Sequence, residues 1–229
     1  MIFDLIRGGF SIQLVINLLV RVFTVFCILP IHEYAHAFTA DKLGDDTPRA
    51  QGRLTLNPMA HLDIMGMLMI FLCGFGYARP VSVNARNFKN PKWGMAITAL
   101  AGPLSNLVMS LIFAVLANIA AIFYAKTMLT VAQITIIFCY FASYINVSLA
   151  VFNLIPVPPL DGSRILNIIL PSKYYFKIMK YERYIVIGIF VLLLTGILSK
   201  PFSMLVSLVM SGITKLAGLP FGDFAVTGI

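Results

Sequence analysis

Charged residues are scarce in this chain of 229 residues: only 11% are Asp, Glu, Lys or Arg, against about 25% in an ordinary soluble domain. Hydrophobic residues make up 59% of the sequence, and the mean hydropathy is +0.91. A water-soluble globule cannot hide this much apolar surface, so the composition excludes a soluble protein. One helix per roughly 20 apolar residues leaves room for about five or six membrane passes and no sizeable soluble domain.

Cysteines and acidic residues are also few. Cys27, Cys73 and Cys139 lie far apart in apolar runs and form no Cys-x-x-Cys pair, which argues against a cysteine metal site or a disulfide framework. The 9 acidic residues face 17 Lys and Arg, which gives a net charge of +8. Because the basic residues stand between apolar runs, they favour contact with a lipid bilayer over nucleic-acid binding. Homo-oligomerisation stays open.

The apolar runs predict an all-α polytopic membrane protein with about five transmembrane helices, over residues 12–38, 93–124, 131–152, 184–199 and 202–219. A further run over residues 64–77 has only 14 residues, which indicates a re-entrant segment instead of a crossing. Short β-strands are predicted on either side of it, at Arg53–Asn57 and Val81–Asn84. We expect one domain over residues 1–229, with a core over about 10–170, a C-terminal helical hairpin over about 184–219, and no removable signal peptide.

The chemistry is concentrated in one motif. Two of the three histidines and one of the two glutamates fall within His32-Glu33-Tyr34-Ala35-His36. Positions i and i+4 of a helix share a face, so His32 and His36 can reach one metal ion while Glu33 lies beside them. This is the HExxH pattern, in which two imidazoles bind zinc and the glutamate is the general base. Ionisable groups inside an apolar run are costly and usually functional, which favours a metal site over a chance match.

A catalytic zinc takes a third protein ligand, and Asp161 is the strongest candidate. It follows a proline-dense segment, Asn153–Gly162, whose irregular backbone is tolerated near a membrane only where it is buried or lines a cavity. The alternative is a plain Asp-Gly turn. The remaining candidates are less suited: Asp4, Asp223 and Glu182 near termini or interfaces, Asp45 and Asp46 in a turn, Asp63 in the short-strand region, and His61 there in a structural role.

The topology of residues 64–77 decides whether these ligands meet. If this run is re-entrant, the runs 12–38 and 131–152 are parallel and bring HExxH and Asp161 to the same side; if it crosses, they lie on opposite sides. Re-entry places twelve Lys and Arg on the side of the site, against Arg7, Lys126 and Lys200 opposite, with Arg21 and Lys215 unassigned. By the positive-inside rule the site therefore faces the cytoplasm.

The HExxH motif together with Asn153-x-x-Pro-x-Pro-x-Leu-Asp-Gly162 resembles the site-2 protease family of intramembrane zinc metalloproteases. Residues 52–58, 78–84 and 101–106 are similar to its compact prokaryotic branch, and we expect none of the PDZ-like or CBS-like regions of other branches, since the length leaves no room for them. The resemblance implies one Zn²⁺ held by His32, His36 and Asp161, with Glu33 as catalytic base and Asn153 stabilising the oxyanion or orienting substrate. It further implies an endopeptidase of a prokaryotic cell membrane that cleaves transmembrane segments of membrane-anchored regulatory proteins, in regulated intramembrane proteolysis.

Two other function classes stay open at this stage. A polytopic ion or metal transporter would also bury His and Asp, and an inactive metal-binding scaffold would keep the ligands. The 2-His-1-carboxylate set could also hold Fe(II), although Glu33 beside it favours zinc hydrolysis. Of the remaining polar residues, we expect Asn106 and Asn146 to form interhelical hydrogen bonds and Pro30 to kink its helix.

Overall fold

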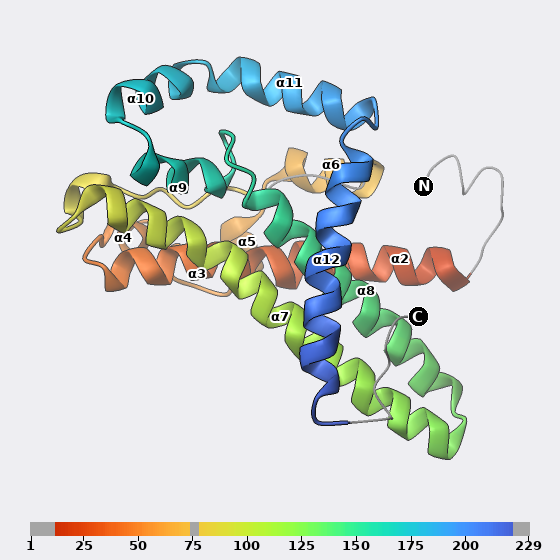
Figure 1. Cartoon of the computed structure of the whole chain (residues 1–229). Helices are drawn as coiled ribbons and strands as arrows, with labels where there is room; N and C mark the ends of the chain where they lie inside the picture. The colour runs from red at the N-terminus through yellow and green to blue at the C-terminus, as the bar shows by residue number, and fades with distance from the viewer. Residues whose placement is uncertain (1–11, 74–77, 222–229) are drawn as a thin grey trace.

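The computed structural model describes residues 12–73 and 78–221, which form helices joined by irregular segments (Figure 1). In chain order the elements are α2 (Ile12–Phe23), the π-helical turn η1 (Thr24–Ile28), α3 (Leu29–Lys42), α4 (Thr47–Ala50), α5 (Pro58–His61), α6 (Ile64–Cys73), the 3-10 turn η2 (Ala85–Asn87), α7 (Pro91–Thr127), α8 (Thr130–Asn153), α9 (Asp161–Ile169), α10 (Ser172–Lys180), α11 (Glu182–Leu194) and α12 (Ser199–Gly218).

Within the described residues, four helical stretches are long and apolar enough to cross a membrane: Leu18–Lys42, Pro91–Thr127, Thr130–Asn153 and Ser199–Gly218. The predicted count of five is therefore not reached. The missing one corresponds to α11, whose 13 residues extend only about 20 Å, against a hydrocarbon core of about 30 Å. The turn that follows α11 contains Gly196, whose φ of +72° is a left-handed conformation that ends helices.

The two predicted β-strands are wrong, because the described residues contain no strand and both segments run as irregular backbone. In Val81–Asn84 the N–H groups of the first and last residues donate to side chains instead of a neighbouring strand. Their acceptors are the carboxylates of Glu33, at 3.1 Å, and Asp45, at 2.7 Å. The alternation of apolar and polar residues along a segment does not reveal hydrogen-bond partners this distant in the sequence.

Helix α6 has the length expected of a re-entrant segment. Its 10 residues extend about 15 Å, half of the hydrocarbon thickness. Arg21 Nη1 donates a hydrogen bond of 2.6 Å to the Ile70 carbonyl, which ties α6 to α2. The last part of the predicted segment, residues 74–77, lies outside the described residues.

A π-helical turn joins α2 to α3, directly before Pro30. Pro30 has no N–H to donate to the carbonyl four residues earlier, so the α-helical hydrogen-bond register cannot continue there. The helical turn is one residue longer here, because the Leu29 N–H donates to the carbonyl of Thr24, five residues earlier. The structure thus shows a π turn before Pro30, a feature found frequently next to functional sites, while the kink stays a prediction.

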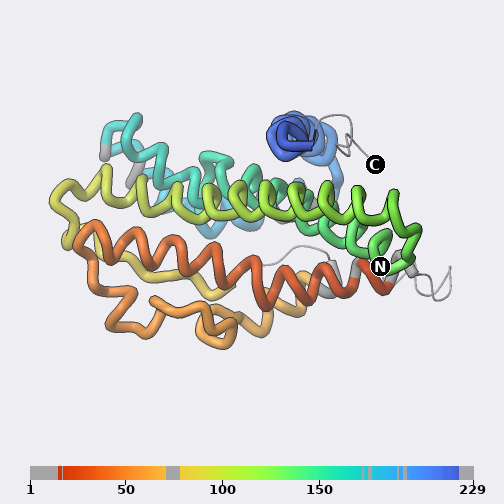
Figure 2. The backbone as a smooth tube through the Cα atoms, turned by 90° about the horizontal axis from the view of Figure 1, so that it is seen from below, coloured from red at the N-terminus to blue at the C-terminus, as the bar shows by residue number. Residues whose placement is uncertain are grey.

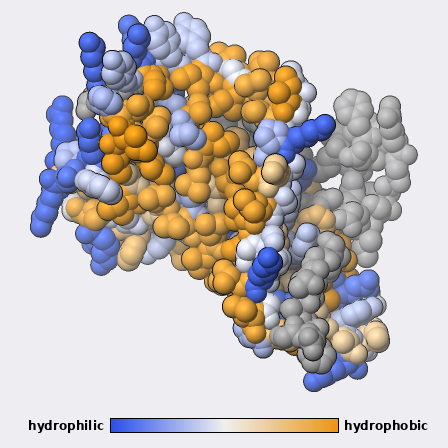
Figure 3. Space-filling view, in the orientation of Figure 1, coloured by the Kyte–Doolittle hydropathy of each residue, from blue (hydrophilic) through white to orange (hydrophobic). Residues whose placement is uncertain are grey.

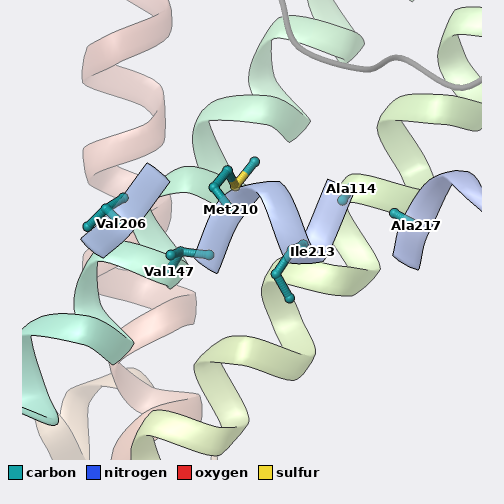
Figure 4. Packing of buried hydrophobic residues seen from close by; sticks show 6 residues of the cluster. All are labelled: Ala114, Val147, Val206, Met210, Ile213 and Ala217. Atoms are coloured by element: carbon teal, nitrogen blue, oxygen red, sulfur yellow. The ribbon is translucent and has the colours of Figure 1, made fainter. Parts of the chain in front are cut away.

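Helix α7 is the central element and contacts α3, α8, α9 and α12. Figure 1 shows α7 and α8 as antiparallel neighbours with α12 lying across them, and Figure 2 shows α3 running alongside α7. Small buried residues let helix backbones approach closely. The cluster in which α7, α8 and α12 meet is drawn in Figure 4 and consists of Ala114, Val147, Val206, Met210, Ile213 and Ala217.

The outer surface of the long helices is apolar. Figure 3 shows hydrophobic residues across the middle of one face, with hydrophilic residues gathered toward its margins. Large hydrophobic side chains stand exposed along α7 and α12, among them Leu104, Val108, Met204 and Leu208. Exposed apolar area of this extent suits lipid and not water. The chain is therefore an integral membrane protein.

Candidate metal centre

Helix α3 presents two imidazoles on one face. His32 and His36 are four residues apart and buried, and their Nε2 atoms lie 3.0 Å from each other. Their rings meet edge to face, with centroids 4.7 Å apart. Each Nε2 therefore points to the same small volume beside the helix.

Asp161 enters that volume from the first residue of α9. Its Oδ2 lies 3.3 Å from His32 Nε2 and 3.2 Å from His36 Nε2. The next residue, Gly162, has no room for a side chain, since a Cβ there would lie 2.3 Å from the Leu154 carbonyl oxygen. The proline-dense loop thus packs directly against the start of α9 and delivers the carboxylate to the histidines, as the sequence predicts for irregular backbone at this position.

Electrostatics keep this carboxylate ionised. Burial works to raise the pKa of Asp161, but hydrogen bonds and charge interactions with His32 and His36 outweigh it, so the pKa lies below its ordinary value. The carboxylate is the form that binds a metal ion.

The three donor atoms have the spacing of a metal site. They lie within 4.8 Å of one another, with separations of 3.0, 3.2 and 3.3 Å. Donors about 2.0–2.1 Å from a tetrahedral zinc ion are separated by about 3.3 Å. Two imidazoles and one carboxylate are also a donor set of catalytic zinc, which leaves the fourth position for water. The residues present fit a zinc ion.

Glu33 lies next to the three donors without joining them. It is buried on α3, and its Oε2 accepts the hydrogen bond of 3.1 Å from the Val81 N–H. Glu33 lines a cavity of about 290 Å³ together with all three donor residues. The Glu33 carboxylate lies beside the three donor residues but is hydrogen-bonded to the Val81 N–H, so it can exchange protons with a molecule in that cavity.

The same cavity receives residues from distant parts of the chain. Asn153 reaches it from the last turn of α8, and Arg164 from the first turn of α9. Ala78, Pro80 and Val81 line it with non-helical backbone. The cavity is thus bounded by the end of α8, the start of α9 and the irregular segment 78–81, with the three donor residues among them.

Comparison with known proteins agrees with this site. Residues 20–196, more than three quarters of the chain, match the family model for Peptidase family M50. The chain belongs to this family. The resemblance drawn from the two motifs, and with it the expectation of a peptidase, is confirmed.

Relatives of this M50 peptidase carry matching names. It is 43% identical over 177 residues to "Putative zinc metalloprotease YwhC" of Bacillus subtilis, an alignment that covers 76% of this chain and 80% of the relative. It is 28% identical over 188 residues to "Putative zinc metalloprotease Rip2" of Mycolicibacterium smegmatis, covering 78% and 68%. "Zinc metalloprotease MJ0392" of Methanocaldococcus jannaschii is 28% identical over 177 residues, covering 76% and 42%. No solved structure gives a significant match.

Helix α7 of the M50 peptidase supports both histidines from behind. The Thr98 carbonyl lies 2.7 Å from His36 Nδ1, and because a carbonyl can only accept, His36 donates this hydrogen bond. One turn along, a Cβ on Gly102 would lie 2.3 Å from His36 Nε2 and 2.6 Å from His32 Cε1. The glycine therefore gives the two imidazoles room to lie against α7. Residues 101–106 contributed to the family resemblance, but nothing in the sequence indicated this contact of Gly102 with the imidazoles.

Two residues near the motif have structural contacts. His61 is fully buried and donates from Nε2 to the Thr55 carbonyl at 2.8 Å, in line with the structural role expected of it, and it is not part of the donor cluster. Asp45, which the sequence places in a turn, is a buried acceptor. It binds Thr47, the Asn84 N–H and the Asn87 side chain, and so fastens residues 84–87 to the end of α3.

The two predicted interhelical asparagines behave differently. The Asn106 amide lies 3.1 Å from His32 Nδ1, which joins α7 to α3 as expected. Asn146 instead donates to the Ala142 carbonyl of its own helix, at 2.9 Å.

Proposed function

We propose that this M50 peptidase is a zinc-dependent endopeptidase that cleaves transmembrane segments of membrane-anchored regulatory proteins, in regulated intramembrane proteolysis. The observation that carries the proposal is the cluster of His32, His36 and Asp161 with Glu33 at its side. Two of its ligands stand on a stretch, Leu18–Lys42, that is apolar and long enough to cross a membrane. Family membership and the relatives' names support the enzyme class and zinc.

His32, His36 and Asp161 would hold the zinc ion. When bound, the zinc ion would supply a water of pKa about 7 and would polarise the scissile carbonyl. The donor atoms are imidazole nitrogens and one carboxylate oxygen, which Fe(II) also accepts. Hydrolysis is favoured because Glu33, a proton acceptor, lines the same cavity.

Glu33 is the general base in this proposal. It takes a proton from the attacking water and returns one to the leaving amine. The hydrogen bond from the Val81 N–H orients its carboxylate. Since this N–H is used by Glu33, we infer that the segment around Val81 caps the cavity.

Asn153 supplies the polar side chain for the reacting carbonyl. Asn153 lines the cavity with Glu33 and the donor residues, and an amide N–H can donate to the oxyanion or to the substrate backbone. A transmembrane helix conceals its carbonyls in hydrogen bonds, so we infer that the substrate unwinds locally before it is cut.

The site lies toward the cytoplasmic side of a prokaryotic cell membrane in this proposal. The twelve basic residues assigned to the side of the site support that orientation. All cavity-lining residues fall between Leu29 and Arg164, inside the proposed core of about 10–170 in a single domain over 1–229. The proposed hairpin over about 184–219 contributes none of them.

The test replaces the two glutamates of the chain one at a time. Glu33→Gln should keep zinc and lose cleavage by roughly 10²–10⁴-fold, whereas the matched control Glu182→Gln should cleave like the wild type. A tagged Glu33→Gln chain, expressed in cells, should also trap an uncut membrane protein, which then serves as the substrate. Cleavage by Glu33→Gln at the wild-type rate would refute the proposal.

The rival classes give different results in the same preparations. A transporter would carry zinc across a liposome membrane without cutting the trapped protein. An inactive scaffold would bind zinc and leave that protein intact in the wild type as well.

A further inference from the structure

Three residues of α7, each one turn apart, face the two imidazoles. Thr98 accepts the hydrogen bond from His36, Gly102 leaves space for both rings, and Asn106 places its amide 3.1 Å from His32 Nδ1. Residues at i, i+4 and i+8 share one face of a helix. The support of the donor set is therefore a continuous stripe on α7, one helix away from the HExxH motif.

An imidazole that binds a metal ion through one ring nitrogen needs a hydrogen-bond partner for the other nitrogen. A neutral histidine that offers Nε2 to a metal ion carries its proton on Nδ1, and that N–H needs an acceptor. His36 has one in the Thr98 carbonyl. At His32 the contact with Nδ1 is the side-chain amide of Asn106.

The side-chain oxygen of Asn106 can accept the hydrogen bond from His32 Nδ1–H. With the amide nitrogen toward His32, the buried Oδ1 of Asn106 has no hydrogen-bond partner. The two ends of an amide have nearly the same shape, so the hydrogen-bond network decides which end faces a neighbour. With Oδ1 facing His32, the oxygen accepts the Nδ1–H, and the amide NH2 group takes the place that the oxygen held.

We propose that Asn106 is a positioning residue, whose Oδ1 accepts from His32 Nδ1–H, fixes the ring and its tautomer, and so presents Nε2 to the metal. This inference rests on the proposed function in one respect, since it takes a metal ion as the ligand. It requires nothing of the substrate or of Glu33.

The alternative is that Asn106 only fills space between α3 and α7. Asn106→Leu keeps the volume and removes the acceptor, whereas Asn106→Asp keeps an acceptor at the same place. A matched control is Asn118→Leu, at another buried asparagine about 18 Å farther along the same helix. Asn118 donates to the Ala217 carbonyl at 3.2 Å, far from the donor set.

The experiment measures metal affinity in purified, detergent-solubilised full-length protein, by competition for Zn²⁺ with a chromophoric chelator. We expect Asn106→Leu to weaken zinc binding about 10–100-fold, and Asn106→Asp and Asn118→Leu to stay near the wild type. The visible spectrum of the Co²⁺ form should change in Asn106→Leu alone. If Asn106→Leu does not fold, Asn106→Asp decides: loss of zinc affinity there contradicts an acceptor role.

The outcomes separate the two proposals. A wild-type chain that binds no zinc would refute the proposed function. A wild-type chain that binds zinc, with equal affinity in Asn106→Leu or with equal loss in Asn118→Leu, would overturn the role of Asn106 and leave the proposed function standing.

Discussion

The substitution Gly102→Ala tests how closely the site depends on α7. The added Cβ would lie 2.3 Å from His36 Nε2 and 2.6 Å from both His32 Cε1 and His36 Cε1. Non-bonded heavy atoms rest at about 3.5 Å, so the imidazoles must retreat by about 1 Å. His36 cannot retreat freely, because its Nδ1 donates to the Thr98 carbonyl on the same helix.

The expected loss is large at the site and small elsewhere. A displacement of about 1 Å in a catalytic constellation costs about 10²-fold in rate, and we expect zinc affinity to fall along with it. Helix α7 itself should not suffer, since alanine is favoured over glycine inside a helix by roughly 0.5–1 kcal/mol. Gly102→Ala should therefore fold normally and fail at the metal centre.

The assay compares zinc content, chelator competition and cleavage of the trapped substrate in Gly102→Ala and in Gly212→Ala. Gly212 is a helical glycine on α12 with no atom within 4 Å of an added Cβ, so the same substitution there should change neither metal nor activity. Full zinc affinity and full cleavage in Gly102→Ala would refute the packing argument.

Three further predictions concern other parts of the site and its orientation. Asp45→Asn should lower the melting temperature at pH 7, because hydrogen bonds hold the pKa of Asp45 below its ordinary 3.8 despite burial. Stability from such a group is present above the ordinary pKa and is lost as pH falls through the folded-state value, so the difference between wild type and variant should shrink only as the pH of the melt falls below 3.8. Gly162→Ala should reduce zinc affinity in chelator competition, since its Cβ would meet the Leu154 carbonyl oxygen at 2.3 Å and push Asp161 away. On intact cells, a membrane-impermeant thiol reagent should label Lys126→Cys and spare Lys89→Cys; the opposite pattern would reverse the proposed orientation.

Local spacing accounts for the part of the site that sequence predicts best. His32, Glu33 and His36 lie within five residues, and the helical repeat alone places both histidines on one face. Asp161 lies over a hundred residues away, and it was linked to them by the topological argument and by the resemblance of residues 153–162 to a family motif. The structure brings all three donors within 4.8 Å of one another.

The hydrogen-bond partners that sequence analysis did not identify are residues distant along the chain. The Val81 N–H finds Glu33 and the Asn84 N–H finds Asp45, so a segment with strand-like alternation forms no strand. The side chain of Asn106 meets an imidazole 74 positions earlier. Alternation and helical periodicity report burial of one face, and they carry no information on which distant polar group satisfies a given N–H.

The central claim is that His32, His36 and Asp161 hold one zinc ion, and X-ray absorption at the zinc edge of the purified wild-type protein tests it most directly. We expect one zinc per chain, a first shell of nitrogen and oxygen only, and the outer-shell scattering of two imidazoles. Asp161→Asn should change that shell and weaken zinc binding. Sulfur in the first shell, or a wild-type chain that binds no zinc, would contradict the account.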